Sequence, residues 1–200
     1  TGLEVDLLPG EAMAQSMDSI NTGRVSAVVV FKAYGPSPQT IYVPTVYKQQ
    51  LEFAYAGFDH EHSFLDGDQP LPSDRMTAGK IDVFSGVAVA RMTFGDIGHD
   101  FADCLAGYDK QAADSGTVVY QVFLPLTAPC TGAAVAILRQ HGYFFGGVMP
   151  RWFGGDALFM QKIAGQPNFS TIRLYTDRAK ALLALIRDDW QAVTNSTEAL

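Results

Sequence analysis

The chain has 200 residues, 48% of them hydrophobic and 12% aromatic, which is enough to bury a substantial core in one compact unit. Charged residues make up only 18%, the formal net charge is -7, and lysine and arginine form no run, so binding to a nucleic-acid backbone is excluded. No apolar run approaches the ~20 residues of a membrane span, and the start does not resemble an export signal. We therefore expect a soluble, cytoplasmic protein without a membrane partner. The first residue is Thr1 rather than methionine, so we expect a piece of a longer protein.

The first quarter of the chain predicts helices and strands in alternation. Residues 1–25 are expected to form a helical extension, because apolar side chains recur at helical spacing within 11–20. Residues 26–32 and 39–43 are rich in β-branched side chains and predict two strands. Residues 45–55 carry spaced apolar side chains and predict a helix.

A polar loop is predicted over residues 59–74, where His60 and His62 stand beside carboxylates. Two imidazoles on one side of an extended segment can bind zinc or nickel, as a metal-dependent hydrolase would require. No third and fourth ligand follows at a useful spacing, so we favour a solvated loop and no metal site. Cys104 and Cys130 are far apart in sequence and are expected to be buried small hydrophobes rather than a disulfide or metal pair.

The middle of the chain predicts a βαβ unit. Residues 81–84 and 86–94 predict two strands that can pair as a hairpin. A helix with one apolar stripe is expected over 100–115, followed by a strand over 118–124 whose apolar run suits coverage on both faces. The crossover should be right-handed, and ligands of such units bind outside the carboxyl ends of the strands.

The last third predicts a helix that ends at Gly142, followed by a hairpin of strands 143–149 and 156–163. Residues 170–175 predict an edge strand. A regular amphipathic helix starts at Asp177, and its apolar face must pack on the sheet or on a partner.

This order of elements resembles the carboxyl-terminal half of the GNAT superfamily of N-acetyltransferases. Strand, glycine-containing turn, helix, strand, helix with a Gly-aromatic stop and final hairpin follow one another from Phe94 to Ile163. Residues 142–150 and 155–161 are also similar to GNAT-like domains attached to ATPases of the anti-sigma-factor serine-kinase type, with a fainter similarity upstream at residues 41–44.

The resemblance implies an α/β (α+β) fold, namely an acyl-CoA N-acyltransferase-like mixed sheet flanked by helices. Residues 26–165 would form the GNAT-like domain, and residues 166–200 would add a strand and a helix that pack on it. Residues 1–25 would precede this domain as the helical extension.

The resemblance also implies a binding site for acetyl-CoA or another acyl-CoA. In the family, the turn after the long strand holds the pyrophosphate on backbone N–H groups, and the opening toward the next strand receives the pantetheine arm. Carried over, this assigns pantetheine contacts to Met92 and Phe94, and phosphate contacts to Gly95, Asp96, Ile97 and Gly98. The glycines are shifted relative to the family's pattern, and Asp96 opposes an anion. A tight turn that needs two glycines is the alternative interpretation.

The family's proton donor is missing. Its tyrosine corresponds to Leu138, which cannot donate a proton, and its customary asparagine corresponds to Thr131. Tyr143 is the candidate catalytic acid in its place, although an aromatic residue at a strand start is more often part of the core. Other ionisable candidates, which helix capping or the helix dipole also explains, are His99, Asp100 and His141.

Two functions remain open. The first is an acyl-CoA-dependent N-acyltransferase (acetyltransferase) that acts on a small-molecule or protein amine. The second is a degenerate GNAT-like domain that senses a ligand or binds a protein within a regulatory protein, for which Trp152 and Phe153 would provide an interface anchor. A homodimer or an adjoining regulatory domain is the expected protein partner. Both functions require parallel strands with an opening near residues 92 and 120.

Overall fold

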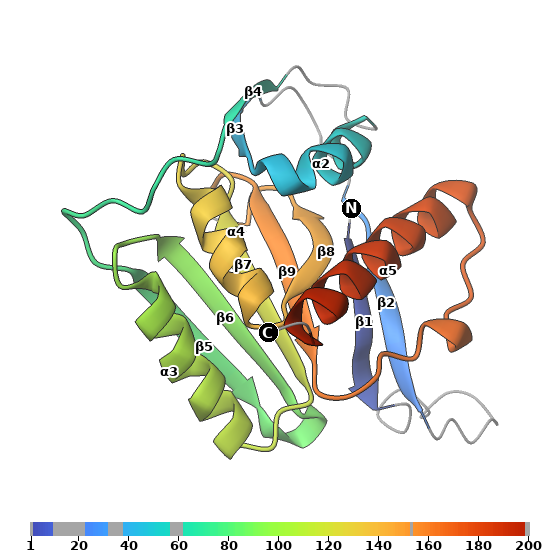
Figure 1. Cartoon of the computed structure of the whole chain (residues 1–200). Helices are drawn as coiled ribbons and strands as arrows, with labels where there is room; N and C mark the ends of the chain where they lie inside the picture. Colours follow the sequence, from blue (N-terminus) through green and yellow to red (C-terminus); the bar gives the residue numbers. More distant parts are fainter. Residues whose placement is uncertain (1, 10–22, 32–37, 57–61, 153, 199–200) are drawn as a thin grey trace.

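The computed structural model describes residues 2–9, 23–31, 38–56, 62–152 and 154–198 (Figure 1). One mixed sheet has the strand order β2-β1-β8-β9-β7-β6-β5, and β3 and β4 form a separate parallel ribbon. The strands are β1 (Gly2–Pro9), β2 (Arg24–Val29), β3 (Thr40–Val43), β4 (Ser63–Asp66), β5 (Ala78–Phe84), β6 (Val89–Asp96), β7 (Val119–Pro125), β8 (Phe144–Met149) and β9 (Ala157–Ile163). The helices are α2 (Lys48–Tyr55), α3 (Phe101–Asp114), α4 (Thr131–Gln140) and α5 (Asp177–Glu198), with short 3₁₀ turns at Thr45–Tyr47, Ser85–Val87 and Phe169–Thr171.

The fold class is the predicted one, a mixed α/β sheet flanked by helices. β6 and β7 are parallel and are joined by α3, so the predicted βαβ unit is present. β7 lies inside the sheet and is buried along its whole length, as its apolar run predicted. β8 and β9 form the predicted final hairpin beside it.

The two faces of the sheet carry cores of different size. Val122 and Leu124 of β7 face the large core, where α3, α4 and α5 contribute the residues that cover the sheet (Figure 1). Phe123, between them, points to the opposite face and packs with Phe159 of β9 and two other buried residues. The alternation of a strand thus places successive side chains in different cores.

The amino-terminal part of the chain differs from the prediction. Residues 2–9 form β1, which lies between β2 and β8 in the main sheet, so the expected helical extension is wrong for this stretch. The helix predicted over 11–20 lies outside the described residues. β1 is held partly by a side chain, because the Gln161 amide accepts from the Val5 N–H (2.9 Å) and donates to the Leu3 carbonyl (3.0 Å).

The carboxyl-terminal part contains the predicted amphipathic helix, α5, but not the strand expected over 170–175. Residues 169–171 form a 3₁₀ turn, and irregular backbone leads from there to α5. Asp189 of α5 accepts hydrogen bonds from the Phe145 N–H of β8 (2.7 Å) and the Tyr47 hydroxyl (2.9 Å), and it is ion-paired with Arg139 of α4. These contacts fix α5 over the sheet.

The predicted loop over 59–74 also differs, because it contains β4. β4 pairs in parallel with β3, and the Tyr42 N–H of β3 donates to the Leu126 carbonyl just beyond β7 (2.8 Å). The ribbon is therefore attached at the carboxyl end of β7.

Candidate functional site

β6 and β7 separate at their carboxyl ends. They are paired from Val89 with Val119 to Thr93 with Phe123. Beyond that point β6 pairs only with β5 and β7 only with β9. A shift in the β5–β6 register at Gly95 marks an irregularity of the kind that bends a strand. The parallel direction agrees with the prediction, but the opening expected near residues 92 and 120 lies farther along, because both positions are inside the paired stretch.

A cavity of about 620 Å³ lies at this end of the sheet. This volume falls within the roughly 300–1,000 Å³ that is usual for small-molecule sites. Its first wall consists of Gly95 and Asp96 at the end of β6 and of Ile97, which follows β6. Its second wall runs from Pro125 to the start of α4 and includes Thr127 and Cys130. The residues after β4 form the third wall.

We call residues 67–77, which join β4 to β5, the strap. Its first end is bonded to the start of α4, where the Gly132 N–H donates to the Gly67 carbonyl (2.8 Å) and the Gln69 N–H donates to the Pro129 carbonyl (3.1 Å). A Cβ atom at Gly132 would collide with the Asp68 carboxylate, so a larger residue fits at this position only if the exposed Asp68 side chain moves.

The other end of the strap covers the turn between β6 and α3. The Gly98 N–H donates to the Thr77 hydroxyl (3.0 Å), and the His99 N–H donates to the Arg75 carbonyl (3.2 Å). The Thr77 N–H in turn donates to the Asp100 carboxylate (2.7 Å), and this bond lowers the pKa of Asp100. Of the four residues predicted to hold phosphate, Gly98 thus has its N–H bonded to the protein's own chain, as has the neighbouring His99.

The structure brings only some of the predicted cofactor residues together. Gly95, Asp96 and Ile97 line the cavity, and Gly98 lies directly under the strap. Met92 and Phe94 are fully buried, and the Phe94 ring packs against Phe101 with ring centroids 4.9 Å apart. Their side chains belong to the core on the helix-covered face rather than to the cavity wall.

Tyr143 lies near the other end of the strands. It precedes Phe144, which pairs with Gln161, and Gln161 pairs with Gln121 in the first half of β7. Its hydroxyl is fully buried and donates to Asp109 of α3 (2.6 Å). Burial, followed by the Asp109 charge, raises the pKa of Tyr143 well above its ordinary value. Tyr143 and the cavity are therefore two separate places in the molecule.

Asp109 is the centre of a polar cluster that the sequence did not reveal. Lys162 donates to its carboxylate (2.7 Å), and the Nδ1 atom of His141 lies 3.3 Å from the same oxygen. The Lys162 ammonium also lies 4.5 Å from the ring centroids of both Tyr120 and Tyr143. Burial lowers the pKa of Lys162, partly offset by Asp109. These residues come from four separated segments, so no local spacing predicted the cluster.

The positions that match the family's proton donor are also buried. Leu138 packs in the core, and the Thr131 hydroxyl at the start of α4 lies 2.8 Å from the Pro125 carbonyl. The ionisable side chains that line the described part of the cavity are Asp74, Arg75, Asp96 and Cys130. Burial raises the pKa of the Cys130 thiol, which favours its neutral form. Both cysteines are free; Cys130 is buried as predicted, and Cys104 is partly buried.

A buried carboxylate, Asp156, lies beside the end of β7. It accepts hydrogen bonds from the Tyr55 hydroxyl (2.8 Å), the Gln39 amide (3.2 Å) and the Arg151 N–H (3.0 Å). Burial, followed by the Asp156 charge, raises the pKa of Tyr55. Asp156 thereby connects α2, the segment before β3 and the start of β9. Sequence reasoning missed this role because the partners are far apart in the chain.

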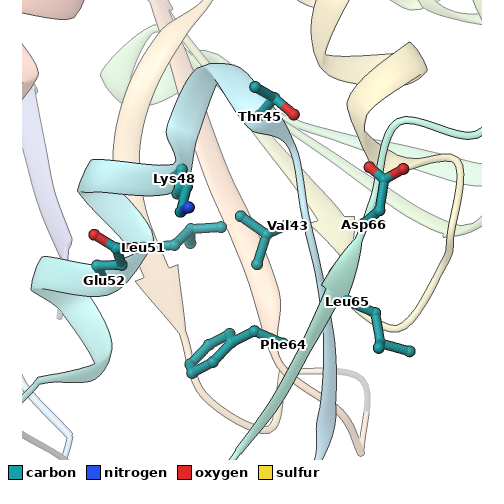
Figure 2. Close-up of a pocket in the computed structure, with 8 residues that line it drawn as sticks. All are labelled: Val43, Thr45, Lys48, Leu51, Glu52, Phe64, Leu65 and Asp66. Atoms are coloured by element: carbon teal, nitrogen blue, oxygen red, sulfur yellow. The ribbon is translucent and has the colours of Figure 1, made fainter.

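A second pocket of about 380 Å³ lies between α2 and the β3–β4 ribbon. Figure 2 shows Val43, Leu51 and Phe64 at its apolar centre, with Lys48 and Asp66 among the polar side chains around it. His62, at the start of this ribbon, packs against Tyr55 with ring centroids 4.9 Å apart, and His60 lies outside the described residues. Within the described ranges, no group of three or more metal-binding side chains could hold an ion.

No helix in the described part of the chain is long and apolar enough to cross a membrane. No family model and no curated protein matches the chain. Among solved structures, a ribosomal-protein-alanine N-acetyltransferase from Brucella melitensis is similar at 22% identity, with a TM-score of 0.33, over 44% of this chain and 61% of that protein. The NatC complex bound to Gag peptide and CoA is similar at 15% identity, with a TM-score of 0.33, over 44% of this chain and 60% of its own. The chain thus spans less than two thirds of either protein.

Proposed function

We propose that the protein binds an acyl thioester in the cavity between β6 and β7 and transfers the acyl group to an amine, as an acyl-CoA-dependent N-acyltransferase. One observation carries this proposal: the parallel strands separate beyond Thr93 and Phe123, and a cavity of about 620 Å³ lies at their carboxyl ends. Ligands of open α/β sheets bind at such ends. Gly95, Asp96 and Ile97 are the proposed donor-binding residues.

The proposed reaction is a direct attack of the amine on the thioester. The amine nitrogen forms a bond to the carbonyl carbon, the carbon–sulfur bond breaks, and sulfur leaves with the electron pair as a thiolate. The attacking nitrogen loses a proton, and the thiolate takes one from solvent. Within the described wall, the exposed Asp96 carboxylate is suited to attract the acceptor as an ammonium group. The ammonium releases one proton to solvent before the attack, in addition to the proton that the nitrogen loses after the new bond has formed. Most of the rate would come from holding the two reactants together.

The acceptor is an amine of a small molecule or of a protein. The cavity wall does not favour one of these over the other, since its polar side chains include both acidic and basic groups. A screen of amines with a thiol-release assay would identify the acceptor class.

A specific observation favours the second candidate function, a GNAT-like domain that binds a ligand or a protein without catalysis. The turn donors Gly98 and His99 are bonded to the strap, and Tyr143 is bonded to Asp109 away from the cavity. Trp152 does not add to this case, because its ring stacks on Phe123 with centroids 4.5 Å apart. Phe153 lies outside the described residues.

Ligand-dependent stability combined with turnover tests the proposal. Acetyl-CoA at a hundred times its dissociation constant should stabilise the fold by about 2.7 kcal/mol. Thiol release in the presence of an amine acceptor should then fall strongly in Asp96→Asn and stay unchanged in Asp188→Asn, which alters an exposed carboxylate on α5. Stabilisation without thiol release from any amine would favour the ligand-binding function. Absence of both would refute binding at this cavity.

A further inference from the structure

The strap occupies the place where the diphosphate of CoA would have to bind. Two backbone donors, the N–H groups of Gly98 and His99, point from the turn before α3 toward Thr77 and Arg75 at 3.0 and 3.2 Å. A phosphate would have to break both bonds, since a backbone N–H has one proton to donate.

The strap also leaves no space above the turn. A Cβ atom on Gly98 would collide with the backbone of Arg75, Met76 and Thr77, so the two backbone segments are in direct contact. A diphosphate, which is much larger than a methyl group, cannot enter between them while the strap is in place.

The charges around the turn oppose a diphosphate as well. Asp96 and Asp74 line the cavity, and the carboxylate of Asp100 lies at the start of α3, where it is held ionised by the Thr77 N–H. Arg75 is the basic side chain among the described lining residues. Negative charge at this place disfavours an anion by simple Coulomb repulsion, although the dipole of α3 alone would attract one.

The strap is built into the fold rather than resting on it. Beyond its bonds to the starts of α3 and α4, the Gly67 N–H donates to the Val43 carbonyl (3.0 Å), and the Asp68 carboxylate accepts from the Thr45 N–H (3.1 Å). Gly67 itself is pressed against the backbone of Tyr42 and Val43. Hydrogen bonds therefore hold both ends of the strap, residues 67–69 and residues 75–77.

The space that remains suits an uncharged, slender ligand. The wall of the cavity of about 620 Å³ combines apolar side chains, mostly prolines with Leu71 and Ile97, with the polar side chains of Gln69, Ser73 and Thr127 and the charged groups named above. A pantetheine arm consists of methylene groups and amides and matches such a wall. We infer, resting on the function proposed above, that the acyl donor of this site is an acyl-pantetheine thioester that makes no contact through a nucleotide diphosphate.

Binding of paired donors tests this inference. Acetyl-pantetheine and acetyl-CoA should bind with dissociation constants within about threefold of each other, because the nucleotide adds no contact. Acetyl-CoA binding at least tenfold tighter, or about 1.4 kcal/mol, would overturn the inference and leave the proposed function standing. Failure of both thioesters to bind would overturn the proposed function together with the inference.

The strap can be tested without any ligand. Amide hydrogen exchange at Gly98 and His99 should be slow in the free protein, faster at Gly98 in Thr77→Val, and unchanged in Thr77→Ser, which keeps the hydroxyl acceptor. Fast exchange of both amides in the unmodified protein would overturn the inference, because the donors would then be available to phosphate.

Two sources can supply the same thioester, a free acyl-pantetheine or the pantetheine arm of a carrier protein. Transfer rates from acetyl-pantetheine and from an acetylated carrier protein distinguish them. If one of these two donors reacts faster than the other, the result supports the inference and identifies that donor as the source. A measurable rate from acetyl-CoA alone would overturn it.

Discussion

Replacing Asp189 with alanine should destabilise the protein by about 3–5 kcal/mol, the usual cost of removing one partner from a buried ion pair. The side chain of Asp189 is only 4% exposed and that of its partner Arg139 is 20% exposed. The substitution leaves the guanidinium without its carboxylate in a mostly buried place.

The magnitude follows from the groups that lose a partner. The Phe145 N–H of β8 loses its acceptor in the core, which costs about 1–3 kcal/mol. The Tyr47 hydroxyl, which is fully buried, keeps only its contact with Arg139 (3.0 Å). The unpaired Arg139 charge accounts for the rest. For a chain of this size, each kcal/mol shifts the melting temperature by about 2–4 °C, so a fall of roughly 6–20 °C is expected.

Urea denaturation of Asp189→Ala and Asp188→Ala provides the assay. Asp188 is the neighbouring exposed carboxylate on α5, and its removal should change the free energy of unfolding by no more than about 0.5 kcal/mol. A double variant, Asp189→Leu with Arg139→Met, should recover part of the loss because it removes both charges. A loss below about 1 kcal/mol in Asp189→Ala would refute the reasoning.

Three further predictions concern packing and pH. Gly107→Ala, on an open helix surface, should be neutral or stabilising by up to about 1 kcal/mol in the same denaturation assay. Gly132→Ala should be less stable than Gly107→Ala by about 1 kcal/mol, because the methyl group displaces the Asp68 carboxylate, which accepts from the Thr45 N–H. Glu4→Gln should stabilise the protein at neutral pH, since burial raises the pKa of Glu4, and this gain should vanish at acidic pH, where the carboxyl group is protonated. Stability should fall as the pH rises above about 10, because the tyrosines ionise in the unfolded chain while buried Tyr143 stays neutral in the folded protein. Tyr143→Phe should make this fall smaller. Melting curves recorded over a range of alkaline pH values would measure it.

Each of these has a contrary result. Equal stabilities of the two alanine variants would mean that the Asp68 side chain moves aside without cost. A Glu4→Gln effect that is the same at acidic and neutral pH would show that packing, not charge, causes it. An alkaline melting profile unchanged by Tyr143→Phe would mean that the hydroxyl ionises readily in the folded protein.

The elements with strong local patterns were predictable from the sequence. The apolar run of β7 predicted an interior strand, and the single apolar stripe of α5 predicted a packed helix, because these patterns depend on the element alone. β1 was missed because its inward-facing residues are few, and part of its bonding comes from the Gln161 side chain, more than 150 positions away. Residues 170–175 have strand-like composition, but hydrogen-bond partners rather than composition decide whether a strand forms.

The site was predictable only where it depends on the turn itself. Gly95, Asp96 and Ile97 were singled out for a turn after the strand, and in the structure the last two residues of β6 and the residue that follows it line the cavity; their predicted contact with phosphate stays a prediction. The strap was missed because its hydrogen bonds join it to segments that are 21 (Gly98 to Thr77) to 65 (Gly132 to Gly67) residues away, and those bonds follow from the folded arrangement. Gly98 and Gly132 were the available signal, since each lacks a side chain where the strap crosses.

The strap joins the turn before α3 to the first turn of α4 across the cavity, and this determines how the cavity can respond to a ligand. Because the strap connects the ends of both helices at the cavity, α3 and α4 should not move toward each other when a ligand binds. The cavity should therefore have the same width with and without a ligand. The cavity would then select ligands by a shape that exists before binding. The protein would lose little conformational entropy when the ligand binds.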